Sequence, residues 1–139
     1  MIGTVLRGWV RPDAQHGPRS VRAVIVDHLE RRARGDVEGD ILRNYAADVL
    51  VLSPRGRLEG ADGVRWCGEE LAEAVGPGGC LDYGRLSING PLGHLEWTAS
   101  GPSVAVCQGA ESLVVSEGRI IAQAVHYATG GIRTGGGRP

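Results

Sequence analysis

The sequence contains no phenylalanine, and aromatic residues make up only 4% of its 139 residues. Its hydrophobic core must therefore consist mainly of valine, leucine, isoleucine and alanine, and each tryptophan or tyrosine is expected at a particular position. Hydrophobic residues account for 42% of the chain and charged residues for 22%, as in ordinary globular domains. A chain of this length forms one core. The composition excludes both wholesale disorder and a fibrous architecture.

Cysteine is also scarce. Cys67, Cys80 and Cys107 are odd in number and widely spaced, with no Cys-x-x-Cys pair and no histidine at zinc-finger spacing. A disulfide framework and a structural zinc site are both disfavoured, and each cysteine is expected as a small buried hydrophobe. The sequence has no glycine-rich phosphate loop between a strand and a helix, and no set of metal ligands. We expect no cofactor and no metal.

Neither sign of charge is in excess, since 15 basic residues against 16 acidic residues give a net charge of -1. No basic stripe could neutralise a phosphate backbone, so nucleic acid is not an expected partner. The arginine-rich stretch 31–34 is balanced by nearby acidic residues and predicts a solvated helix face. No apolar run could span a bilayer, and Arg7 interrupts the stretch where a secretory signal needs a continuous apolar core. We expect a soluble, cytoplasmic protein with no membrane partner.

Glycine, in contrast, is abundant, with 23 residues. Residues 1–19 include prolines and a glycine without sustained periodicity, and residues 130–139 are dominated by glycine. We therefore predict an N-terminal arm over 1–19, one α+β domain over 20–129 and a flexible glycine-rich C-terminal tail over 130–139.

Three helices are predicted in the first half of the domain. The first runs from a cap at Ser20 to a stop at Gly35, and His28 lies on its apolar face. Asp36 caps a short second helix, and Asp62 caps a third helix that ends at residue 75. The expected inward positions of the second helix are Val37, Ile41, Leu42 and Tyr45.

Strands are predicted on both sides of the third helix. A strand over 48–52 closes with the turn Ser53-Pro54-Arg55-Gly56, and four strands follow the helix at 81–89, 92–99, 104–116 and 119–128. Short turns make the last four antiparallel neighbours, and Gly109 sits where a bulge could bend the sheet. The order predicts an α+β fold, a cone-shaped curved antiparallel sheet packed against three N-terminal helices and enclosing a pocket.

Several short motifs occur in a characteristic order. They are Gly35-Asp36, Tyr45-Ala46-Ala47-Asp48-Val49, Ser53-Pro54, Glu111-Ser112 and Gly118-Arg119-Ile120. In this order the chain resembles the nuclear transport factor two-like superfamily over residues 21–128, and in particular its SnoaL-like branch. The resemblance implies a cone-shaped fold with a pocket between the helices and the sheet, often dimeric through the sheet. It leaves function open, because the superfamily includes ketosteroid isomerases, polyketide cyclases, epoxide hydrolases, dehydratases and non-catalytic binding or scaffold proteins.

The ketosteroid isomerase pattern of that superfamily implies roles for three positions. It places the donor to the substrate oxygen on His28, the carboxylic acid of the oxyanion hole on Glu111 and the general base on Ser53. A serine cannot replace a carboxylate base, which argues against the simplest isomerase activity.

His28 and Glu111 are the candidate catalytic residues. His28 shares a helix face with apolar residues and can donate, accept or move a proton near neutral pH. Glu111 alternates along its strand with Gly109 and Leu113, which favours an inward position. The alternatives are a core histidine bonded to a backbone carbonyl and a solvated glutamate at the pocket rim.

Further residues are candidates for binding a ligand. Trp97 on one face of its strand and His94 with Glu96 on the other compete for the pocket, because a register slip of one residue exchanges the faces. We expect Gln123 and Tyr127 inside and His126 toward a sheet interface. The full set is Tyr45, Trp66, His94, Glu96, Trp97, Gln123 and Tyr127.

These residues favour a small, cofactor-independent biosynthetic enzyme. It would use acid–base chemistry for cyclisation, isomerisation or dehydration of a largely apolar, carbonyl-bearing small molecule such as a polyketide. The alternative is a non-catalytic small-molecule-binding or scaffold protein of the same fold. A homodimer formed through the sheet is the expected assembly.

Overall fold

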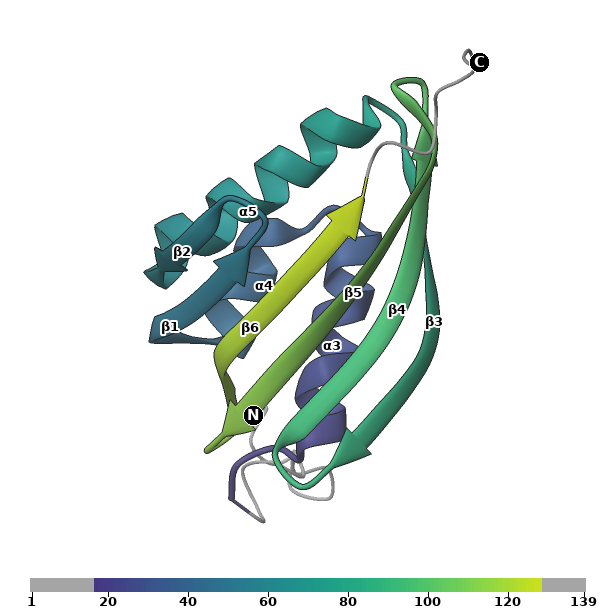
Figure 1. Cartoon of the computed structure of the whole chain (residues 1–139). Helices are drawn as coiled ribbons and strands as arrows, with labels where there is room; N and C mark the ends of the chain where they lie inside the picture. The colour runs from purple at the N-terminus through teal and green to yellow at the C-terminus, as the bar shows by residue number, and fades with distance from the viewer. Residues whose placement is uncertain (1–16, 129–139) are drawn as a thin grey trace, which may run out of the picture.

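The computed structural model describes residues 17–128, without the side chains of residues 104–106. In this part of the chain, helices and a curved sheet form two layers, with its three helices on one face of the sheet (Figure 1). The helices are α3 (Val21–Ala33), α4 (Val37–Asn44) and α5 (Gly60–Val75). The strands are β1 (Tyr45–Ser53), β2 (Gly56–Glu59), β3 (Cys80–Asn89), β4 (Leu92–Gly101), β5 (Val104–Ser116) and β6 (Arg119–Ala128). The α+β prediction is confirmed.

The sheet has six strands in the order β2-β1-β6-β5-β4-β3. The four C-terminal strands form the predicted antiparallel meander. The early strand β1 joins it by pairing in parallel with β6, and the unpredicted β2 pairs with β1 as a hairpin. Strand β2 has only four residues, of which Leu58 alone is partly buried, so it leaves almost no pattern in the sequence.

Helix α3 follows its prediction closely. The Ser20 side chain accepts a hydrogen bond from the Ala23 backbone N–H, which caps the helix. Val24, Ile25 and His28 are its buried residues, as the helical spacing indicated. The packing of α3 on the sheet therefore carries His28 into the interior.

Helix α4 departs from its prediction. Asp36 caps it as expected, but the helix ends at Asn44, and Tyr45 is the first residue of β1. Leu42 is 79% exposed, so its predicted inward position is wrong. The buried residues of α4 are Asp40 and Asn44, one turn apart. A polar helix face that is buried by hydrogen bonding carries no hydrophobic signal, which explains the error.

Two smaller expectations are also wrong. Helix α5 begins at Gly60 rather than after a cap at Asp62, and Glu59 in the N-cap position makes no side-chain capping bond. Gly109 lies in regular register opposite Trp97, and the irregularities of β5 lie elsewhere. A Cβ atom at Gly109 would collide with the Trp97 indole ring, so this glycine provides room for a side chain instead of a bend.

The predicted N-terminal arm lies mostly outside the described residues, and so does the predicted tail over 130–139. Within the described part, the Arg19 guanidinium donates to the Asn44 side chain and to the backbone carbonyls of Arg43 and Gly118. Arg19 thereby ties the start of α3 to the end of α4 and to the β5–β6 turn.

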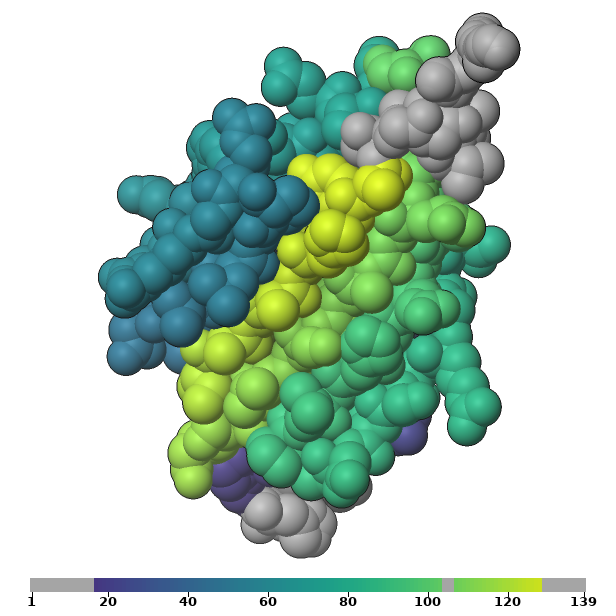
Figure 2. Space-filling view, in the orientation of Figure 1, coloured from purple at the N-terminus to yellow at the C-terminus, as the bar shows by residue number. Residues whose placement is uncertain are grey.

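The core lies between the helices and the inner face of the sheet. The largest cluster of buried hydrophobic residues includes Val24, Ile25, Val49, Val51, Val64, Leu95, Leu113 and Ile120. No helix within residues 17–128 covers the other face of the sheet, which presents β1, β6, β5 and β4 side by side (Figure 2). Among residues 17–128, no helix combines the length and apolar character needed to cross a bilayer.

Candidate active site

A cavity of about 380 Å³ lies between α3, α5 and the inner face of the sheet. This volume falls in the range of sites for small molecules. Its lining is largely apolar, with a few polar side chains contributed by α3, α5 and the strands. The polar side chains are His28, Arg32, Cys67, Tyr83, Glu111, Gln123 and Tyr127.

The structure brings the two candidate catalytic residues together. His28 on α3 and Glu111 on β5 are both buried, at 2% and 7% exposure, and both line the cavity. His28 Nε2 lies 3.5 Å from Glu111 Oε2. Among the described residues, Nε2 has no hydrogen-bond partner of good geometry. A buried polar atom of this kind is costly unless a ligand or water completes it.

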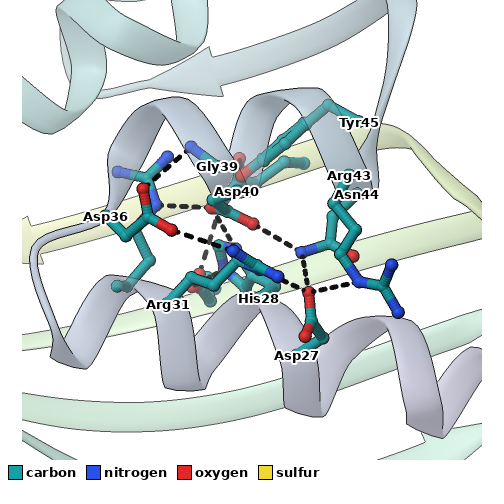
Figure 3. A network of polar contacts seen from close by, with 12 residues as sticks. Asp27, His28, Arg31, Asp36, Gly39, Asp40, Arg43, Asn44 and Tyr45 are labelled. Atoms are coloured by element: carbon teal, nitrogen blue, oxygen red, sulfur yellow. Dashed lines mark hydrogen bonds and ion pairs between the residues drawn. The ribbon is translucent and has the colours of Figure 1, made fainter.

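Asp40 on α4 is the main site residue that the sequence prediction missed. It is fully buried, and its Oδ2 lies 2.8 Å from His28 Nδ1 (Figure 3). The same oxygen accepts a hydrogen bond from Arg32 Nε at 2.6 Å, while Oδ1 accepts one from the Asn44 amide at 2.9 Å. His28 is thus bonded to a carboxylate and not to a backbone carbonyl, which excludes the alternative considered for it.

His28, Arg32, Asp40 and Glu111 form what we call the charged cluster. Burial acts to lower the pKa of His28, but its contacts with Asp40 and Glu111 outweigh burial and raise that pKa to about 9. Burial acts to raise the pKa of Asp40, but its contacts with His28, Arg32 and Asn44 hold it below its ordinary value. At neutral pH His28 is therefore an imidazolium, with Nδ1–H donating to Asp40 and Nε2–H facing Glu111 and the cavity.

A second set of hydrogen bonds orients Glu111. The Tyr45 hydroxyl donates to Gln123 Oε1 at 2.7 Å, and Gln123 Nε2 donates to Glu111 Oε1 at 3.2 Å. Burial raises the pKa of Tyr45, so its hydroxyl stays protonated and remains a donor. Because Oε1 of Glu111 is held in this way, Oε2 is the oxygen presented to His28.

The remainder of the cavity is apolar. Trp97 and Tyr127 lie against each other, with ring centroids 6.0 Å apart and planes inclined by 43°. Together with Leu71 and Val75 of α5 they form what we call the apolar wall. The expected inward positions of Gln123 and Tyr127 agree with the structure, and of the two alternatives left open for β4 the structure has Trp97 inside. Leu71 and Val75 had no predicted role in the pocket.

Other candidates lie away from the cavity. Trp66 does not line the pocket. Its ring packs beneath the Arg55 guanidinium, with Arg55 Cζ 5.6 Å from the ring centroid. His94 and Glu96 are exposed on the face of β4 opposite Trp97, and His94 bonds to the Ser112 hydroxyl. Their predicted pocket positions are wrong, because the register of β4 turns Trp97 inward. Tyr45 acts behind the lining, through Gln123.

Three further expectations concern nucleophiles and metals. Ser53 is the last residue of β1, its hydroxyl bonds to the backbone of Arg55 and Gly56, and it lies outside the cavity. Cys67 lines the cavity, but burial raises the pKa of its thiol, which weakens it as a nucleophile. Cys107 is buried as expected, whereas Cys80 is exposed. Within residues 17–128, no group of three or more His, Cys, Asp or Glu side chains is arranged to hold a metal ion.

Comparison with known proteins identifies the fold. No protein-family model and no curated protein matches the chain. Among solved structures, a presumed ketosteroid isomerase from Kribbella flavida is 19% identical over 86% of this chain and 82% of its own, with a TM-score of 0.64. A presumed SnoaL-like polyketide cyclase from Mesorhizobium loti is 17% identical over 78% and 100%, with a TM-score of 0.61. A nuclear transport factor two-like protein of unknown function from Cytophaga hutchinsonii is 11% identical over 81% and 94%, with a TM-score of 0.63.

The chain has the nuclear transport factor two-like fold. The sequence resemblance is confirmed at the level of the fold. The named neighbours differ from one another in activity, and sequence identities this low do not transfer an activity. Function must therefore be argued from the side chains of this nuclear transport factor two-like cavity.

Proposed function

We propose that this protein is a cofactor-independent acid–base enzyme that acts on a small, largely apolar molecule bearing a carbonyl group. The observation that carries the proposal is the open Nε2 of His28, which faces Glu111 inside an otherwise mostly apolar cavity. Because Nε2 and Oε2 are only 3.5 Å apart, one small molecule beside the pair can contact both atoms. Such a pair can polarise a carbonyl and remove a neighbouring proton.

In the proposed reaction, His28 Nε2–H donates a hydrogen bond to the substrate carbonyl oxygen. Oε2 of Glu111 takes a proton from the carbon next to that carbonyl, and the C–H electron pair becomes an enolate held by the imidazolium. Glu111 then returns its proton. Delivery to another carbon gives isomerisation. In cyclisation the enolate carbon attacks a second carbonyl and the proton goes to the alkoxide that forms. In dehydration the proton goes to a β-hydroxyl, which leaves as water. Glu111 supplies the base that Ser53 cannot.

Asp40 has a positioning role in this scheme. It holds the His28 ring by Nδ1 and keeps it protonated, so that Nε2 always presents a donor. Arg32 and Asn44 fix Asp40 in turn. A donor that is oriented before the substrate arrives needs no reorganisation during the reaction, which is the basis of electrostatic stabilisation in enzymes.

The proposal is tested by proton exchange, which needs no knowledge of the natural substrate. Methyl 3-benzoylpropanoate, a neutral aryl ketone, is incubated with the protein in D₂O, and loss of its α-protons is followed by NMR. We expect the wild type to accelerate exchange and Glu111→Gln to reduce that acceleration by about 100-fold or more. The matched control is Glu73→Gln, at an exposed position of α5, which should exchange like the wild type. Equal exchange rates for Glu111→Gln and the wild type would exclude Glu111 as the base.

One observation favours a second candidate, a non-catalytic binding protein. The charged cluster contains two basic side chains, Arg32 and His28, and two acidic ones, Asp40 and Glu111, so it can balance its own charges without a ligand. A binding protein of this kind would take up the ketone without accelerating exchange in any variant. The same experiment therefore separates the two functions.

We also propose that two copies pair through the uncovered face of the sheet. Leu52, Leu92 and Ile121 are exposed there, and His126 lies on the same face as Ala124. Burying such apolar side chains favours association. Light scattering should give the mass of a dimer for the wild type and of a monomer for Ile121→Glu, whereas a monomeric wild type would contradict the pairing.

A further inference from the structure

Arg32 is a charged cavity residue that the proposed reaction does not use directly. It lies on α3 one turn after His28, so both side chains occupy the same face of the helix. Its side chain is only 16% exposed and lines the cavity. A buried guanidinium beside a largely apolar wall is unfavourable unless its donors are used. Its position therefore calls for a physical reason.

Asp40 uses only part of the Arg32 guanidinium. Nε donates to Asp40 Oδ2, and His28 Nδ1 shares that oxygen. The two terminal nitrogens do not form the parallel pair of bonds with a carboxylate that arginine prefers. Arg32 also approaches the Tyr45 hydroxyl within hydrogen-bonding reach, and both this contact and its charge act to lower the pKa of Tyr45. Arg32 also lines the cavity, so part of its guanidinium borders the space where a ligand would lie.

A glycine on α5 provides the space for this guanidinium. Gly68 lines the cavity, and a Cβ atom built there would lie 2.8 Å from Arg32 Nη1. Gly68 lies inside a helix, where alanine is intrinsically preferred over glycine. The absence of a side chain at Gly68 therefore favours the observed position of the guanidinium.

We infer that the pocket binds a keto acid, with the terminal nitrogens of Arg32 holding the substrate carboxylate while His28 holds the ketone oxygen. The planar guanidinium matches a carboxylate in shape and charge. Residues one helical turn apart have Cβ atoms about 5–6 Å apart, so the carboxylate and the ketone are separated by a few bonds. The ketone half of this inference rests on the proposed function, but the carboxylate half does not.

The other charges of the site tolerate such a ligand. Asp40 keeps the donors His28 Nδ1 and Asn44 Nδ2 when Arg32 also binds the ligand. The two nitrogens of the imidazolium face Asp40 and Glu111 respectively, so the positive ring separates these carboxylates. The apolar wall receives the remainder of the molecule. The substrate is therefore an apolar body that carries a ketone and a carboxylate.

The test compares 3-benzoylpropanoate with its methyl ester, which share a skeleton and a ketone and differ in charge. Binding is measured by isothermal titration calorimetry at one pH and one salt concentration. We expect the wild type to bind the acid about tenfold more tightly than the ester, and Arg32→Gln to lose that preference. The matched control is Arg22→Gln, an exposed arginine on the same helix, which should keep the preference. Equal affinity of the wild type for both probes, or an unchanged preference in Arg32→Gln, would overturn the inference.

Two further variants keep the outcome decisive. Gly68→Ala leaves every charge in place and crowds Nη1 of Arg32. It should therefore weaken the preference for the acid even if Arg32→Gln does not fold, and an unchanged preference in Gly68→Ala contradicts the inference.

The second variant, Glu111→Gln, should lose proton exchange but retain the preference for the acid. Loss of exchange in Glu111→Gln without any acid preference in the wild type would refute only the carboxylate site. A preference that depends on Arg32, together with unchanged exchange in Glu111→Gln, would refute only the proposed reaction.

Discussion

The charged cluster and the apolar wall line the same cavity but are built in different ways. In the charged cluster, each group is held by a named partner, and Asp40 alone accepts from His28, Arg32 and Asn44. In the apolar wall, the Trp97 ring packs against Tyr127 and fits over Gly109, where any side chain would collide with it. The cluster fixes where protons and charges lie, while the wall fixes shape. Damage to the cluster should therefore alter charge states, and damage to the wall should alter fit.

The largest effect is expected from Asp40→Ala. This change leaves His28 and Arg32 buried without their shared carboxylate, and breaking a buried ion pair costs about 3–5 kcal/mol. Urea unfolding measures the loss. The control is Asp62→Ala, whose side chain is 99% exposed on α5 and whose removal should change little. An Asp40→Ala protein as stable as the wild type would show that the cluster is not held by Asp40.

A pH effect of similar origin follows for the wild type. The pKa of His28 is raised to about 9 in the fold, so the folded state binds more protons than the unfolded state between its ordinary value of 6.5 and 9. Among the described residues, Asp40, Glu111 and Tyr45 contact His28, and Arg32 shares the Asp40 Oδ2 atom with it.

The stabilisation from His28 is therefore complete below about pH 6.5 and is lost as the pH rises through 9, a total on the order of 3 kcal/mol. Urea unfolding at several pH values checks this, and His28→Phe should remove that part of the pH dependence. Stability that rises from pH 7 to 9 would contradict the assigned charge of His28.

The apolar wall should respond more weakly. Gly109→Ala places a methyl group against the Trp97 indole, and overpacking of this kind costs about 1–3 kcal/mol. We expect lower stability, a shift in tryptophan fluorescence and weaker binding of methyl 3-benzoylpropanoate, with the pKa of His28 unchanged. A displaced His28 pKa in this variant would mean that the wall and the cluster are coupled.

The smallest effect is expected on the opposite face of β4. His94 is exposed, its side chain bonds only to Ser112 among the described residues, and it lies three positions before the buried Trp97, on the opposite face of the strand. His94→Ala should alter neither the unfolding free energy beyond error nor the affinity for either benzoylpropanoate probe. Calorimetric titration of this variant checks the inward and outward faces of β4 directly.

The sequence was informative where burial is hydrophobic. His28 could be found because it shares the apolar face of α3 with Val24 and Ile25, and Glu111 because strand alternation places it beside Leu113. The meander could be predicted for a different reason: each turn is specified by its own residues, and short turns join antiparallel neighbours.

The polar half of the site could not be found in this way. Asp40 and Arg32 lie in charged stretches that favour a solvated surface, and the prediction of a solvated face is wrong for Arg32. Their burial depends on mutual pairing between two helices, which no periodicity records. The inward face of β4 was equally undetermined, because His94, Glu96 and Trp97 exchange faces with a slip of one residue.

The central claim is that His28 is a positively charged donor with an open Nε2 at neutral pH. Titration of its ring by NMR tests this most directly, with wild type and Asp40→Asn compared under identical conditions. We predict that the wild-type ring titrates near 9, well above the ordinary value of 6.5, and that its pKa falls in Asp40→Asn. A His28 ring that titrates at or below its ordinary value in the wild type would contradict the claim, because a neutral ring that donates Nδ1–H to Asp40 has no proton left on Nε2 to donate to the substrate.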